Sequence, residues 1–129
     1  MTSVAHPVIV WVAVFLLSGC AMTQPFAPPE PSSNTAVLAL VNKAHDEAAA
    51  GRMDAAGASL ERALRIEPRN PVLWQELARV RLDQGQYRQA QNMAAKSNAL
   101  AGGNRYLEAE NRRIIDEAHR RRGDGGDAE

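Results

Sequence analysis

The sequence predicts an all-α protein, an α-solenoid of two helix–turn–helix repeats followed by a C-terminal capping helix. The first observation is an internal repeat, because residues 37–70 align without a gap with residues 71–104. A fixed period of this kind indicates stacked helical units. The second observation is composition: no Asp, Glu, Lys or Arg precedes Glu30, and the chain after it is rich in Ala, Arg and Glu, which favour helix. Helices are expected at about 36–50, 53–66, 71–84, 87–101 and 104–121.

An apolar run, residues 8–17, lies near the start of the chain. It is too short for a membrane-spanning helix, which needs about 20 apolar residues. It has the length of a signal-peptide core, about 7–15 residues. Ser18 and Gly19, both small, then lead to Cys20, which is the single cysteine of the chain. One cysteine cannot form an intramolecular disulfide or a multi-cysteine zinc site.

Residues 17–20, Leu-Ser-Gly-Cys, resemble the lipobox of bacterial lipoproteins. The resemblance implies that residues 1–19 are a lipoprotein signal peptide and that Cys20 becomes the lipidated first residue, carrying acyl chains such as palmitate. Two or more acyl chains give stable membrane anchoring. Ala21 stands where the enterobacterial sorting rule places Asp for inner-membrane retention, so the outer membrane is expected. The alternative is an ordinary apolar N-terminal helix with a buried thiol.

Residues 20–35 contain four prolines and no helical periodicity. Such a segment cannot bury a core, and proline-rich linkers favour an extended form of about 3.1 Å per residue. We therefore expect a flexible tether with a reach of roughly 45 Å between the anchor and the repeats.

The two repeat units carry the same kinds of residue at equivalent positions. Gly51 and Gly85 fall at the turn inside each unit, where glycine breaks a helix. Ala56 and Ala90 are small enough for the two helices of a unit to cross closely. Each unit is therefore predicted to be a helical hairpin.

The junction between the units, residues 63–71, reads ALRIEPRNP. Pro68 ends one helix, and Asn70 can cap the next helix with Pro71 at its first position. The junction and the other shared positions resemble the tetratricopeptide repeat family, with a W-x2-L-G-like signature at Trp74, Leu77 and Ala78 and with Met53 and Tyr87 filling the joints.

The C-terminal segment from Asn104, a predicted N-cap, has an apolar stripe at helical spacing. It resembles the solvating helix that closes many tetratricopeptide arrays; the alternative is the first half of an unfinished third repeat. The resulting domain is expected at 36–122, with repeats at 37–70 and 71–104, a capping helix at 104–121 and a disordered tail at 123–129.

Charge and motifs argue against several function classes. The formal net charge is zero, with 15 basic and 15 acidic residues, which does not favour nucleic-acid binding driven by bulk charge. His45 and His119 have no partners at metal-ligand spacing. The sequence contains no nucleophile elbow or phosphate-binding loop, so we expect no enzyme activity, no metal and no cofactor apart from the covalent lipid at Cys20.

The family resemblance implies a concave face that binds a protein partner. We expect an outer-membrane-anchored, periplasm-facing adaptor in cell-envelope assembly; small tetratricopeptide lipoproteins include activators of peptidoglycan synthases and pilotins of pilus or secretion pores. Stacked repeats usually need three or more units, so a homodimer is a possible state. The resemblance places on the concave face Leu38, Val41, His45, Val72, Gln75, Arg79, Leu82, Asp83, Tyr106 and Arg113.

Overall fold

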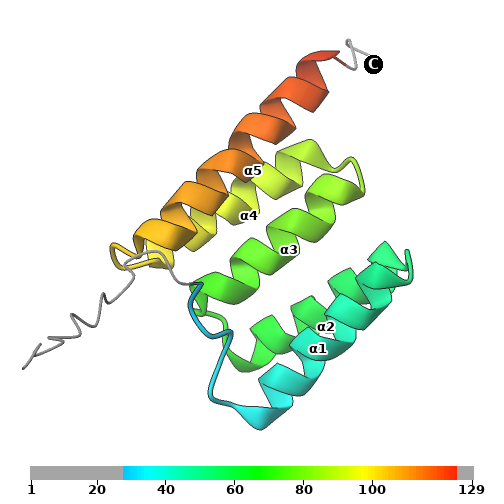
Figure 1. Ribbon diagram of the computed structural model, residues 1–129, viewed down its shortest axis with the longest axis vertical. Helices are drawn as coiled ribbons and strands as arrows, with labels where there is room; N and C mark the ends of the chain where they lie inside the picture. Colours follow the sequence, from blue (N-terminus) through cyan, green and yellow to red (C-terminus); the bar gives the residue numbers. More distant parts are fainter. Residues whose placement is uncertain (1–27, 125–129) are drawn as a thin grey trace, which may run out of the picture.

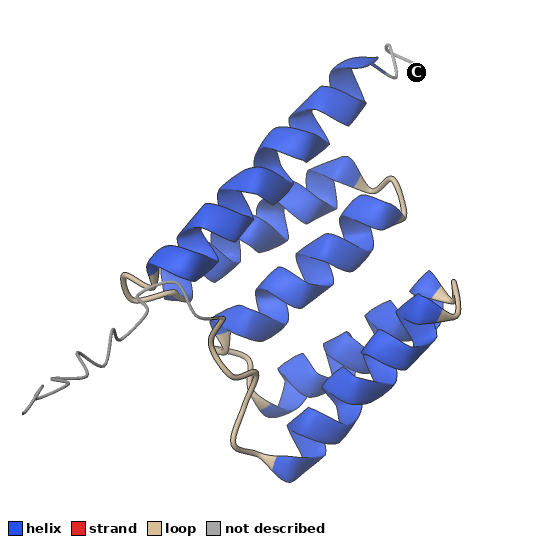
Figure 2. Ribbon diagram, in the orientation of Figure 1, coloured by secondary structure: helices blue, strands red, loops and turns tan. Residues whose placement is uncertain are grey.

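The computed structural model describes residues 28–124 of the chain. The predicted signal peptide, Cys20, the first part of the predicted tether and the last five residues lie outside the described residues. Between residues 28 and 124 the chain is helical and contains no strand, as predicted (Figures 1 and 2). The five helices are α1 (Thr35–Ala49), α2 (Met53–Ile66), α3 (Pro71–Asp83), α4 (Tyr87–Leu100) and α5 (Arg105–Asp124).

The helices form two hairpins and a final helix, as expected for a tetratricopeptide array. α1 pairs with α2, α3 pairs with α4, and α2 joins the two hairpins by packing on α3 (Figure 1). α5 packs on α4 and also reaches α3. The first and last helices of the array therefore have different surroundings: the backbone of α5 lies close to that of α3, whereas α1 and α3 share an apolar core with α2 through their side chains.

Asparagine side chains begin three of the helices. Asn34 and Asn70 cap α1 and α3 with the same geometry: each Oδ1 accepts the backbone N–H of the second helical residue at 2.9 Å and of the third at 3.4 Å. Asn104 caps α5 by accepting the N–H of Leu107 at 3.1 Å. These side chains satisfy N–H groups that have no partner inside the helix, which confirms the predicted caps at Asn70 and Asn104.

The turn inside each hairpin depends on a glycine. Gly51 and Gly85 both have φ of +75°, in the left-handed region that residues with a Cβ rarely adopt. Helices commonly end at such a glycine. At both repeat positions predicted to break the chain, the backbone therefore favours glycine.

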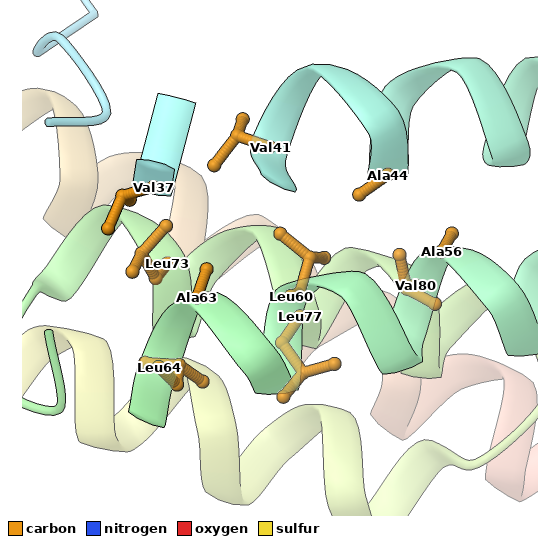
Figure 3. Packing of buried hydrophobic residues seen from close by; sticks show 10 residues of the cluster. All are labelled: Val37, Val41, Ala44, Ala56, Leu60, Ala63, Leu64, Leu73, Leu77 and Val80. Atoms are coloured by element: carbon orange, nitrogen blue, oxygen red, sulfur yellow. The ribbon is translucent and has the colours of Figure 1, made fainter. Parts of the chain in front are cut away.

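Two apolar clusters hold the helices together. The first joins α1, α2 and α3, and its side chains point toward one another around Leu60, Leu73 and Leu77 (Figure 3). The second joins α3, α4 and α5 and consists mostly of alanines with Ile114. Ala90, like its counterpart in the first repeat, is fully buried, as expected for a residue at a helix crossing.

Two predicted boundaries differ from the structure. α5 continues to Asp124, so the predicted tail begins two residues too early. Residues 28–34, assigned to the flexible tether, are instead placed against the turn between α2 and α3. There, Asn70 Nδ2 donates to the Pro31 carbonyl at 2.6 Å, and Ser32 Oγ donates to Glu67 Oε1 at 2.6 Å. Within residues 28–124 no helix combines the length and apolarity needed to cross a bilayer.

Candidate partner-binding face

The ten predicted partner-binding residues divide into two groups in the structure. Six are accessible and define what we call the inner face, on α1, α3 and α5: Leu38, His45, Arg79, Asp83, Tyr106 and Arg113. The other four are buried, with exposed fractions of 1% for Val41, 8% for Val72, 2% for Gln75 and 9% for Leu82. In this conformation these four residues are not accessible to a partner, and the prediction that they contact one stays a prediction.

Packing explains why these four residues are not accessible. Val41 belongs to the first apolar cluster and Leu82 to the second. Val72 lines two hollows whose other wall is formed by residues 29–31. Gln75 lies under α5, where its Nε2 donates to the Leu107 carbonyl at 3.4 Å. The last helix therefore fills part of the expected groove.

A buried polar cluster fixes α5 on the second hairpin. Asn111 of α5 is fully buried; its Oδ1 accepts from Gln75 Nε2 at 3.2 Å. Its Nδ2 donates at 2.8 Å both to Ser97 Oγ and to Asn98 Oδ1 of α4. Ser97 Oγ donates in turn to the Pro71 carbonyl at 2.8 Å. We call Gln75, Ser97, Asn98 and Asn111 the Asn111 network.

Sequence reasoning did not find the Asn111 network, although one signal was present. Asn111 lies four residues after Leu107 and three before Ile114, on the apolar stripe of α5. A polar side chain on a buried stripe needs hydrogen-bond partners. Ser97, which replaces the alanine typical of the repeat, supplies one of them.

Polar side-chain pairs cross the inner face between neighbouring helices. His45 Nε2 of α1 lies 3.2 Å from Glu76 Oε2 of α3. Arg79 Nη2 of α3 lies 3.1 Å from Glu110 Oε2 of α5, and Arg113 pairs with the same carboxylate. The accessible surface is therefore of mixed charge, with two guanidinium groups around one carboxylate on the α5 side.

The basic run at the end of α5 is engaged within its own helix. Glu117 accepts hydrogen bonds from both Arg120 and Arg121. These hydrogen bonds lower the pKa of the Glu117 carboxyl, and the same carboxylate raises the pKa of Arg121. Within residues 28–124 no three His, Cys, Asp or Glu side chains are arranged to hold a metal ion.

Residues 28–34, which we call the strap, form one wall of two hollows at the N-terminal ends of α3 and α5. The larger hollow, of about 610 Å³, lies between residues 29–32 and the α2–α3 turn. The smaller, of about 250 Å³, lies between residues 28–31 and the inner-face residues Arg79 and Tyr106. The strap therefore borders the end of the inner face (Figure 1, blue segment before α1).

Comparison with known proteins agrees with this architecture. The family model described as tetratricopeptide repeat matches residues 47–110. The chain is a tetratricopeptide repeat protein, a class of helical arrays suited to binding protein partners.

The chain is also similar to a solved structure, the globular C-terminal domain of LpoP from P. aeruginosa. The two share 37% sequence identity with a TM-score of 0.69, and the match covers 74% of this chain and 90% of the LpoP domain. The chain belongs to the family of that domain. Among curated proteins none matches the chain significantly.

Proposed function

We propose that this protein is a lipid-anchored tetratricopeptide protein of the outer membrane that faces the periplasm, binds a peptidoglycan synthase and activates it. The observation that carries the proposal is an LpoP-like repeat domain on the same chain as a lipobox-like sequence ending at Cys20. The similarity to LpoP favours this role over that of a pilotin, the other role implied by the resemblance to small tetratricopeptide lipoproteins.

The chemistry of the inner face supports a protein partner. Tyr106 and Leu38 are half-buried apolar side chains that can accept apolar anchors. Arg79 and Arg113 flank Glu110, and the Arg113 side chain is 77% exposed, so it remains available to a carboxylate of a partner. Charge complementarity of this kind mainly sets specificity and association rate.

The short distance between the predicted lipid anchor and the repeats supports the same proposal. Pro28, where the described chain begins, lies eight positions after Cys20, and such a segment spans at most about 28 Å. The repeats are then held near the membrane at a high effective concentration for any partner within reach. A synthase domain that extends toward the outer membrane meets this condition.

Reversal of two charges on the inner face tests the proposal. Arg79→Glu with Arg113→Glu puts two new carboxylates beside that of Glu110. We expect crosslinking to the synthase, and the stimulation of its glycan polymerisation, to fall at least tenfold. The matched control, Arg62→Glu with Arg88→Glu, makes the same charge change at exposed positions on α2 and α4. Equal effects of the two pairs would place binding elsewhere, and no stimulation by the wild-type chain would refute the synthase as partner.

A further inference from the structure

The strap crosses from α1 to the N-terminal ends of α3 and α5, although it is adjacent in sequence only to α1 (Figure 1). Its central residues, Pro31 and Ser32, are half-buried. The hydrogen bonds to Asn70 and Glu67 join positions 39 and 35 residues apart in the chain. This is a specific contact and not a chance approach of a linker.

Asn70 is chemically suited to recognise an extended chain. Its Oδ1 caps α3, while its Nδ2 donates to the Pro31 carbonyl and, at 2.7 Å, to Glu67 Oε2. One side chain therefore caps a helix and also binds a backbone carbonyl of the strap. Proline-rich segments are recognised in this manner, through exposed carbonyl groups and apolar surfaces, because their backbone makes no hydrogen bonds of its own.

The surface beside the strap has the complementary composition. Val72 and Tyr106 supply an apolar wall, and Arg79 and Gln75 supply polar groups in the same hollow as Pro28–Pro31. The strap sequence in this hollow is Pro-Pro-Glu-Pro. Glu30 is exposed and lines this hollow together with Glu76 and Arg79, so the match between strap and site rests on the prolines, the Pro31 carbonyl and the apolar wall.

We propose that this end of the inner face is a binding site for an extended, proline-containing segment, and that the strap occupies it within the same chain until a partner segment displaces it. The inference rests on the proposed role of the inner face in partner binding, and it names the kind of segment that binds. Two hydrogen bonds to part-buried groups hold the strap, so exchange with a competing segment requires no unfolding of the helices.

A synthetic peptide copy of residues 25–33, PFAPPEPSS, is the probe, added to the full chain in detergent. A strap variant, Pro28→Ser, Pro29→Ser, Pro31→Ser and Ser32→Ala, removes the proline rings and the Ser32 hydroxyl of the strap and leaves the residues of α3 and α5 that line the site unchanged. We expect it to bind the peptide at least about tenfold more tightly than the wild type, whose own strap competes at a millimolar effective concentration. The adjacent exposed substitution Ser33→Ala is the matched control and should behave as the wild type.

Two further arms make the peptide result decisive. Tyr106→Ala added to the strap variant should abolish binding, and a peptide with serine in place of every proline should not bind. Equal binding by the wild type and the strap variant, or no binding by the folded strap variant, overturns the proposal. Self-association of the wild type that the strap variant lacks also overturns it, because the occupant would then be the strap of a second copy.

The two asparagine caps provide an independent test. Asn70→Asp keeps the capping oxygen but removes the donor to Pro31 and faces Glu67 with a second carboxylate; Asn34→Asp makes the same change at a cap of equal geometry. We expect Asn70→Asp alone to lower the ¹H–¹⁵N NOE of Ser32 and Ser33. Equal values in both variants contradict the strap contact. None of these measurements needs a synthase, so their failure and that of the proposed function are distinguishable.

Discussion

Asn111→Ala is the substitution that most directly tests how α5 is held. The side chain is fully buried and makes three hydrogen bonds, to Gln75, Ser97 and Asn98. Asn98 is half-buried, so water can replace its lost partner, whereas Gln75 and Ser97 are 2% and 0% exposed. Two buried groups thus lose a partner, each at about 1 kcal/mol or more, and a small cavity remains.

We expect Asn111→Ala to lower the free energy of unfolding by about 2–3 kcal/mol. For a domain of this size that corresponds to a fall in Tm of at least about 10 °C. Thermal unfolding followed by circular dichroism measures it, with Asn92→Ala, an exposed asparagine on α4, as the control. A loss below about 0.5 kcal/mol would refute the view that the network holds α5.

The same network predicts a rescue. A triple variant, Gln75→Leu with Ser97→Ala and Asn111→Leu, removes the hydrogen-bond donors and acceptors of the network together. Replacing both partners of a buried hydrogen bond with apolar groups changes the free energy of unfolding little. The Pro71 carbonyl that Ser97 contacts still lies in the first turn of α3, where the helix can satisfy it. We expect the free energy of unfolding of the triple variant to lie within about 1 kcal/mol of the wild-type value. A triple variant as unstable as Asn111→Ala would show that the packing of the side chains, and not their hydrogen bonds, holds α5 in place.

Three further expectations concern the anchor, the helix crossing and the end of α5. Cys20→Ala should abolish incorporation of labelled palmitate and membrane anchoring of the mature protein, and normal acylation would contradict the lipobox. Ala90→Trp should destabilise the domain by about 1–3 kcal/mol or more through overpacking at a fully buried position; unchanged denaturant unfolding would contradict the repeat register. Arg120 and Arg121 lower the pKa of the Glu117 carboxyl. The stability that these two pairs give to α5 is therefore fully present above the ordinary glutamate pKa of about 4.3, and it is lost as the pH falls through the lowered pKa. A carboxyl NMR titration should show this pKa rising toward the ordinary value in Arg120→Ala with Arg121→Ala.

The helices were predictable because their boundaries depend on local chemistry. Asn70, Pro71 and Gly85 each act within a few residues of their own position, and the structure uses them as a helix cap, a first helical residue and a left-handed turn. A repeated pattern reinforced these signals, since the same residue types occur in both units. Because the conformational preferences of single residues agreed with their positions in the repeat, the fold could be predicted from one sequence.

The accessible binding face was less predictable because it depends on contacts between distant residues. The family positions assume that each first helix of a repeat leaves its inner side open, but Asn111, 36 residues after Gln75, closes that side of α3. The strap was missed for the same reason. Its prolines indicate an extended chain wherever they lie, and nothing near Pro31 in the sequence indicates a contact with Asn70.

The strap determines where the predicted tether joins the repeats. With the strap in place, Pro28, the first residue that the structure describes, lies beside the N-terminal ends of α3 and α5. α5, with 20 residues, extends about 30 Å from that end. Release of the strap adds the seven residues up to Thr35 to the tether, at most about 25 Å of extra reach. A partner segment that displaces the strap would therefore both occupy the site and allow the repeats to move farther from the membrane, toward the synthase that we propose they bind.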